Sequence, residues 1–194
     1  KLSLRCHAPG GWASLKGPGT LRFFLDGGEP VASILYECLF DRLCEVWISG
    51  ESKGGEPFRR VLPKSAVRPV GFALDEGLYP IERRTSPGSR LLQEFFAFPW
   101  KFLFFDLDLD EAREGRHPAL GTAGESDAVE VQFWLDSPPR SDVTVRPTNF
   151  RLGCTPVVNL FRWVPEPTVL THHQTEYPIV PSVEHPNGYE IFSV

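Results

Sequence analysis

The stretch KFLFFDLDLD (residues 101–110) has the clearest strand pattern in the chain, and it predicts that the fold is built on a sheet. One face of this strand is apolar throughout and carries Leu103, Phe105, Leu107 and Leu109. The opposite face changes from aromatic at Phe102 and Phe104 to acidic at Asp106 and Asp108. We therefore expect the first face to lie in a core and the acidic end of the second to reach solvent.

The stretch AVEVQFWL (128–135) alternates in the same way, and we expect it to pair with 101–110 as a hairpin across the polar loop 110–127. Other stretches read as strands or extended segments: 1–6, 21–28, 66–74, 166–182 and 188–194. Pro69 places 66–74 at a sheet edge or bend, because proline has no N–H to donate to a ladder.

Two helices are predicted beside the sheet. From Val31 to Trp47, apolar residues recur at helical intervals, and Pro30 suits a first helical position. These recurring residues are Leu35, Leu39, Leu43 and Val46. A second, short helix is expected after Ser86, with Pro87 at its first position, and it must end before Pro99. Its apolar residues are Leu91, Leu92, Phe95 and Phe96.

The fold class that follows is α+β, with a mainly antiparallel sheet and a few helices packed on it. Residues 1–194 are expected to form a single α+β region, since 41% apolar residues suffice for a sizeable core. Flexible loops are expected near 49–57 and 110–127, where Gly and polar residues gather.

Composition narrows the classes of function. The net charge is −5 and no basic block runs along the chain, so nothing indicates nucleic acid as a partner. No run approaches the roughly 18 apolar residues of a membrane span, so we expect no direct membrane insertion. The cysteines form no C-x-x-C pair, which indicates reduced thiols and no structural zinc site. They are Cys6, Cys38, Cys44 and Cys154.

The stretch FRLGCTPVVNLF (150–161) contains a candidate nucleophile, Cys154, with His172 and His173 downstream as candidate bases. No catalytic signature surrounds this thiol, and no acidic, cysteine or histidine pair has ligand spacing. We therefore predict no catalytic, cofactor-binding or metal-binding residues. A buried structural turn is predicted instead, formed by Cys154, Thr155, Pro156 and Asn159.

The stretch EFFAFPWKFLFF (94–105) is crowded with aromatic side chains. Its candidate residues are Phe95, Phe96, Phe98, Trp100, Phe102 and Phe104. A core absorbs many such rings, and those left over form an exposed apolar strip used by a partner. Both alternatives, core and interface, stay open for these six residues.

Several stretches together resemble the TssF family, also called ImpG or VasA, of the bacterial type VI secretion system. Those that carry the resemblance are LRFFLDG (21–27), RPVGFALDEGLYP (68–80), SRLLQEFFAFPWKFLFFDL (89–107), FRLGCTPVVNLF (150–161) and EYPIVP (176–181). They occur in the family's order and extend over essentially the whole chain. Because family members are considerably longer, the resemblance implies an internal fragment. The first residue, Lys1, and the absence of Met agree with that expectation.

The resemblance implies a structural role in the baseplate wedge, which scaffolds assembly of the contractile tail and sheath. The implied partners are TssG, TssK and a second TssF copy, with other baseplate, spike and sheath proteins further out. The implied location is the cytoplasm, in a baseplate docked at the inner membrane complex. No catalytic residue or cofactor is implied, so we expect a protein that is not an enzyme.

Two alternatives from other classes remain beside this interpretation. One is a cysteine-dependent hydrolase that uses Cys154 with a downstream histidine. The other is a module that binds a small ligand or glycan through surface aromatics. It requires an exposed indole in a groove, from Trp12, Trp47, Trp100, Trp134 or Trp163.

Overall fold

The computed structural model describes residues 1–7, 12, 19–51, 55–80, 86–109, 128–139, 143–185 and 187–193. Its internal contacts divide the chain into two units, Lys1–Pro156 (unit 1) and Val157–Val194 (unit 2), where the sequence predicts a single region. In the described ranges, every helix and strand lies in unit 1.

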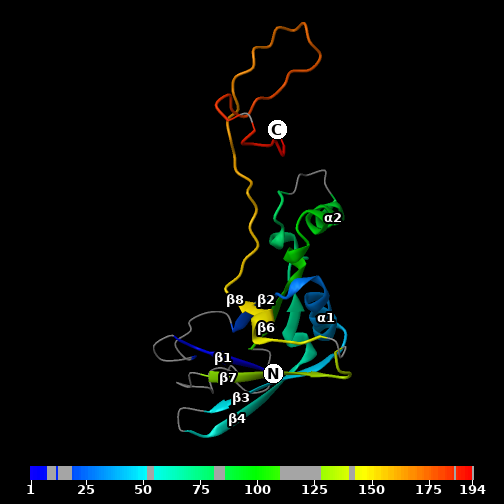
Figure 1. Cartoon of the computed structure of the whole chain (residues 1–194), viewed down its shortest axis with the longest axis vertical. Helices are drawn as coiled ribbons and strands as arrows, with labels where there is room; N and C mark the ends of the chain where they lie inside the picture. The colour runs from blue at the N-terminus through cyan, green and yellow to red at the C-terminus, as the bar shows by residue number, and fades with distance from the viewer. Residues whose placement is uncertain are drawn as a thin grey trace. The chain divides into compact units, whose positions relative to one another are not determined.

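Unit 1 contains two antiparallel sheets of four strands each (Figure 1). The order in sheet A is β1 (Leu2–Arg5), β7 (Ala128–Leu135), β3 (Leu43–Glu51) and β4 (Pro57–Pro63). The order in sheet B is β5 (Val67–Pro69), β6 (Phe104–Asp108), β2 (Thr20–Leu25) and β8 (Phe150–Leu152). The expected edge position of Pro69 is confirmed, because β5 pairs on one side only, with β6.

Two α-helices accompany the sheets: α1 (Gly28–Phe40) and α2 (Pro87–Ala97). Short 3-10 helices lie between the longer elements: η2 (Lys64–Ala66), η3 (Leu74–Glu76), η4 (Pro99–Leu103) and η5 (Pro147–Asn149). The predicted α+β class with antiparallel sheet is confirmed. The second predicted helix begins after Ser86 and ends before Pro99, as expected. Pro30 is the third residue of α1, not the first.

Both sheets and α1 share one hydrophobic core. Phe23 of β2 stands opposite Phe105 of β6, and their rings stack with centroids 5.1 Å apart. Val46 of β3 and Leu39 of α1 are buried in the same cluster. Burial of this apolar area, at about 25 cal/mol per Å², is the main term that stabilises unit 1.

Two acidic side chains of the stretch 101–110 form ion pairs with arginines on the neighbouring strands. Arg22 of β2 makes two hydrogen bonds of 2.8 Å to the Asp106 carboxylate, through Nε and Nη2. Arg68 of β5 donates to Asp108 at 3.0 Å. The strand itself begins at Phe104, because the residues just before it form the 3-10 helix η4.

The predicted hairpin between 101–110 and 128–135 is wrong. β6 pairs with β2 and β5, whereas β7 pairs with β1 and β3, so the two strands belong to different sheets. Their apolar faces meet across the core, where Phe105 contacts Phe133 edge to face at 6.3 Å between centroids. Strands with similar patterns can pack face to face as well as pair edge to edge. The predicted loop 110–127 lies outside the described residues.

The predicted helix over Val31–Trp47 is wrong in its second half, since α1 ends at Phe40 and β3 begins at Leu43. A β-bulge explains the misleading pattern. The register of β3 against β7 shifts between Leu43 and Glu45, so one extra residue, Cys44, is inserted. Leu43 and Val46 are therefore both buried at a spacing of three, which imitates a helix.

The predicted flexible loop 49–57 overlaps a strand at each of its two ends. β3 continues to Glu51 and β4 begins at Pro57, and the two strands pair along their length from Glu45↔Pro63 to Glu51↔Pro57. Residues 52–54 lie outside the described ranges. The turn signals in this stretch are those of a hairpin, which also gathers Gly and polar residues.

The described part of unit 2 contains no helix or strand, so the strand predicted over 188–194 is not formed there. A few hydrogen bonds join residues 163–168 to 178–181. The indole N–H of Trp163 donates to the Pro181 carbonyl at 2.7 Å, and the amide of Glu166 donates to the Val180 carbonyl at 2.9 Å. Proline recurs in both limbs and removes the N–H groups that a regular ladder needs.

Candidate functional site

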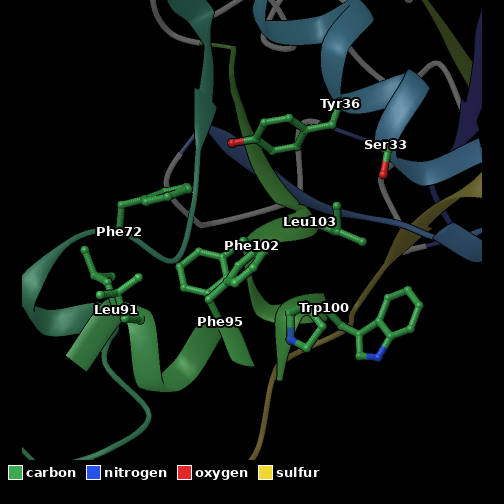
Figure 2. Close-up of a pocket in the computed structure, with 10 residues that line it drawn as sticks. Ser33, Tyr36, Phe72, Leu91, Phe95, Trp100, Phe102 and Leu103 are labelled. Carbon is green, nitrogen blue, oxygen red and sulfur yellow. The ribbon is translucent and has the colours of Figure 1, made fainter. Parts of the chain in front are cut away.

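A pocket of about 580 Å³ lies in unit 1 between α1, α2, η4 and the loop that carries Phe72 (Figure 2). We call it the α2 pocket. It is lined by Ser33, Tyr36, Phe72, Leu91, Leu92, Phe95, Pro99, Trp100, Phe102 and Leu103. Its volume falls within the range of ligand-sized pockets. It is thus a concave, mostly apolar surface built from segments far apart in sequence.

Helix α2 has two neighbouring stripes of side chains, of which one lines the pocket and the other is buried. Leu91 and Phe95, four residues apart, line the pocket. Arg90 and Glu94, also four apart, are almost fully buried. The charged stripe therefore packs inside the protein, and the apolar stripe faces the pocket.

The charged stripe continues into a buried triad formed by Arg90, Glu94 and Lys101. The Glu94 carboxylate accepts hydrogen bonds from Lys101 Nζ and from the amides of Leu78, at 2.8 Å, and Tyr79, at 3.0 Å. Burial by itself raises the pKa of Glu94, but the hydrogen bonds from Lys101 and the two amides outweigh it. The pKa of Glu94 therefore lies below its ordinary value, and the carboxylate stays charged at neutral pH.

Glu94 thus binds the end of the loop 71–79, and Arg90 binds its beginning. Its Nη1 donates to the Leu74 carbonyl at 2.8 Å and its Nη2 to the Ala73 carbonyl at 3.0 Å. Glu76 closes the loop on itself by accepting from the amides of Gly71, at 2.7 Å, and Ala73, at 3.1 Å. Residues 71–79 are thus fastened to α2 through backbone groups that would otherwise lack partners.

This fastening sets the position of Phe72. The ring of Phe72 contacts Phe102 with centroids 5.0 Å apart and forms a wall of the pocket (Figure 2). Gly77 lies so close to Arg90 that a Cβ there would be 2.4 Å from its Nη1. The loop, the buried triad and the pocket are therefore one packed arrangement.

The six aromatic residues singled out in the sequence divide between core and surface. Phe102 and Phe104 are buried, and Phe98 is half-buried. Phe95, Phe96 and Trp100 are exposed over 52%, 81% and 41% of their surfaces. The core alternative therefore fits Phe102 and Phe104, whereas Phe95, Phe96 and Trp100 are available at the surface.

The predicted buried turn is not formed within this chain. Thr155 and Asn159 are exposed, and Cys154 and Pro156 are half-buried. Gly153 adopts a φ of 72°, which ends β8 and turns the backbone out of the sheet. Val157, the first residue of unit 2, is exposed.

The thiol of Cys154 contacts backbone close to it in sequence. Its Sγ donates a long hydrogen bond, 3.9 Å, to the carbonyl of Leu152. Among the described residues, no three His, Cys, Asp or Glu side chains gather where they could hold a metal ion. In the same ranges, no helix combines the length and apolar character needed to cross a bilayer.

The tryptophans occupy different settings. Trp12 is buried, while Trp47 lies between the Arg59 guanidinium, 3.1 Å from its ring centroid, and the ring of Trp134. Trp163 stacks on Tyr189 in unit 2, with centroids 5.1 Å apart. Trp100 is the indole that lines the α2 pocket.

Sequence reasoning missed most of the pocket. Arg90 and Glu94 have the spacing of an ion pair on a helix, but such pairs usually lie on exposed faces, so the pattern gave no sign of burial. Tyr36 and Phe72 come from segments that meet α2 only in the folded chain. Of the six candidate aromatic residues, Phe95, Trp100 and Phe102 line the pocket.

Comparison with known proteins finds a family, a curated relative and a similar solved structure. A family model described as "Type VI secretion system, TssF" matches residues 1–194. Type VI secretion system component TssF1 from Pseudomonas aeruginosa is 28% identical over 174 residues, which cover 90% of this chain and 27% of that protein. A chain in the cryo-electron microscopy structure of the TssK-TssF-TssG baseplate subcomplex is similar with a TM-score of 0.62 and 26% identity. That match covers 86% of this chain and 30% of the other, so this chain spans less than a third of either relative.

Proposed function

We propose, because this chain belongs to the TssF family of the type VI secretion system, that it is a structural segment of a baseplate wedge. The observation that carries the proposal is the family match over the whole chain, residues 1–194. The similarity of its fold to a chain of a TssK-TssF-TssG baseplate subcomplex gives further support. In this role the chain helps to scaffold the contractile tail and its sheath.

TssG and TssK are the proposed partners, since the similar chain comes from a complex that contains both. A second TssF copy, and other baseplate, spike and sheath proteins, complete the proposed surroundings. The exposed apolar side chains near α2, among them Phe96 and Leu92, are of the kind that protein partners cover.

The chain is proposed to be an internal region of a longer polypeptide, consistent with its match to 27% of the length of TssF1. Unit 2 supports this proposal because many of its large apolar side chains are exposed: Val157, Phe161, Trp163, Val164, Val169, Leu170, Val183, Ile191 and Phe192. Other parts of the polypeptide, or its partners, are proposed to cover them.

The protein is proposed to act by packing and not by catalysis, at a baseplate in the cytoplasm that docks at the inner membrane complex. The environment of Cys154 supports this, since among the described residues of unit 1 its thiol hydrogen-bonds to the Leu152 carbonyl and not to a histidine or another base. If the full-length protein hydrolysed an ester or amide and lost that activity on alkylation of Cys154, the non-enzymatic proposal would be wrong.

Co-purification tests the structural proposal. The full-length protein that contains this chain is expressed with TssG and TssK and isolated through a tag on the TssF component. We expect all three to elute together in size-exclusion chromatography. Elution of the folded TssF component alone, without TssG or TssK, would contradict the proposal.

A further inference from the structure

We propose that the loop 71–79 opens from α2 as one unit, a strap that moves while both sheets of unit 1 stay folded. The loop carries Phe72, whose ring forms a wall of the α2 pocket against Phe102 (Figure 2). The pocket as described therefore belongs to the closed state, and the open state lacks this wall. The movement takes place within one unit of the chain, so it does not depend on the proposed function.

The loop begins where the pairing of sheet B ends. The amide of Val70 donates to the Phe104 carbonyl at 3.0 Å, so backbone pairing with β6 extends to Val70. Gly71 follows with a φ of 105°, in the region that favours glycine. A Cβ at this position would lie 2.9 Å from the carbonyl oxygen of Lys101. Gly71 thus combines a close approach with backbone freedom, and we place the hinge of the movement there.

Apolar burial contributes little to holding the loop in place. Phe72 and Leu74 are exposed over 47% and 62% of their surfaces. On the neighbouring strand β6, by contrast, Phe105 and Leu107 are completely buried. Segments with few buried apolar side chains open at a lower free energy than the core. The loop is therefore expected to open before sheet B does.

Charged side chains of α2 fasten the loop instead. Arg90 binds the carbonyls of residues 73 and 74, and Glu94 binds the amides of residues 78 and 79. Both side chains are almost fully buried. When the loop opens, water replaces the lost backbone partners, and hydration of the two charges offsets part of the cost. The loop is thus held by interactions that water can replace.

The two ends of the loop are linked through Glu76. Its carboxylate accepts from the amides of Gly71, at 2.7 Å, and Ala73, at 3.1 Å. The 3-10 helix η3, which ends at Glu76, lies between the groups bound by Arg90 and those bound by Glu94. Loss of either set of bonds removes the backbone geometry that the other set needs. We therefore expect both ends to open together.

Gly77 offers a variant that opens the loop without removing a charge. Its φ of −66° is open to any residue, but a Cβ there would lie 2.8 Å from Cζ of the buried Arg90. Gly77→Ala therefore fits the backbone and displaces the guanidinium from the loop carbonyls. Gly88→Ala on α2 is the matched control, because a Cβ there meets Oγ of Ser86 at an ordinary 3.8 Å.

Hydrogen–deuterium exchange of the full-length protein that contains this chain measures the opening, read at single residues by mass spectrometry with electron-transfer fragmentation. Four amides report on the loop, those of Gly71, Ala73, Leu78 and Tyr79. In the wild type, we expect them to share one opening free energy, below that of the amides in β2 and β6. Gly77→Ala should speed their exchange by about 10-fold or more, whereas Gly88→Ala should leave it unchanged. The Val70 amide should stay protected in all three proteins.

A second variant breaks the other fastening and keeps the test decisive if Gly77→Ala does not fold. Glu76→Ala removes the acceptor of the Gly71 and Ala73 amides, and Asp75→Ala, at an exposed position on the same 3-10 helix, is its control. We expect Glu76→Ala to speed exchange at residues 78 and 79 as much as at residues 71 and 73, although Glu94 binds the former pair. Asp75→Ala should match the wild type.

Three results would overturn the proposal. One is faster exchange at residues 71 and 73 alone in Glu76→Ala, because the two ends would then open separately. Another is wild-type exchange at the four loop amides as slow as in β6, because the loop would then open only with the whole fold. The third is equal exchange in a folded Gly77→Ala and in Gly88→Ala. Co-purification with TssG and TssK tests the proposed function independently of all three.

Discussion

The two units of this chain are both rich in apolar residues, yet only one of them builds a core. In unit 1, both sheets and α1 enclose a shared cluster in which Phe105 and Leu107 are completely buried. In unit 2, large apolar residues such as Val164 and Val169 are almost fully exposed, and the described residues form no helix or strand. Apolar content therefore does not by itself produce a fold.

The difference lies in the pattern of the residues. Unit 1 alternates apolar and polar residues along unbroken strands, so that one face of each strand can be buried. In unit 2, prolines at Pro165, Pro167, Pro178 and Pro181 remove backbone donors from both limbs. Its side-chain contacts are few, as in the stack of Trp163 on Tyr189, and they replace a regular ladder. We propose that unit 2 gains order when another surface covers its exposed apolar side chains.

Truncation of a core ring should have the largest effect. Phe105→Ala removes contacts to Phe23, Phe133 and Phe150 and is expected to lower the free energy of unfolding by about 3–5 kcal/mol. Phe161→Ala in unit 2 is the matched control, and its effect is expected to stay below about 1 kcal/mol. Urea titration followed by circular dichroism measures both. Equal losses would show that the two units do not differ as described.

Disruption of the buried triad should rank next. Glu94→Gln keeps the size of the side chain but leaves the charge of Lys101 buried without a counter-charge, which is expected to cost about 3 kcal/mol. Gln93→Glu, one residue away and exposed, is the control and should change stability by less than about 0.5 kcal/mol. A Glu94→Gln protein as stable as wild type would rule out the triad as a fastening of the loop.

The same carboxylate predicts how stability depends on pH. Because the pKa of Glu94 is lowered in the folded chain, its contribution is present above the unfolded pKa of about 4.3 and is lost as pH falls through the folded value. The melting temperature of the wild type should therefore drop below about pH 4 more than that of Glu94→Gln. Parallel curves for the two proteins would contradict this assignment.

The smallest effect is expected where the sequence predicts a buried turn. Asn159→Leu changes an exposed side chain, so the free energy of unfolding of this chain should shift by less than about 0.5 kcal/mol. Calorimetry of the isolated chain measures it. A loss above about 2 kcal/mol would mean that Asn159 is buried after all, as the sequence pattern suggests.

Local patterns predicted much of unit 1. The strands β1, β2, β5 and β7 and both ends of α2 follow from alternation and from proline positions, because these signals act within a few residues. The pairing of β6 did not follow, since its partners β2 and β5 are distant in sequence. The start of β3 was predicted as helix, because the bulge at Cys44 gives its buried residues a helical spacing.

The candidate site was predictable only in part. The aromatic run 94–105 indicated Phe95 and Trp100, but the pocket also needs Tyr36 and Phe72. Phe72 lies in the loop 71–79, whose carbonyls and amides are bound by the buried side chains of Arg90 and Glu94. Hydrogen bonds between side chains and the backbone of a distant segment produce no periodic pattern in a sequence.

Hydrogen–deuterium exchange tests the central contrast most directly. The chain 1–194 is compared with the full-length protein in complex with TssG and TssK. We expect the amides of β2, β3, β6 and β7 to be protected in both samples, and those of residues 157–193 to exchange rapidly in the isolated chain and slowly in the complex. Equal protection of residues 157–193 in both samples would contradict the account, since unit 2 would then be ordered without a covering surface.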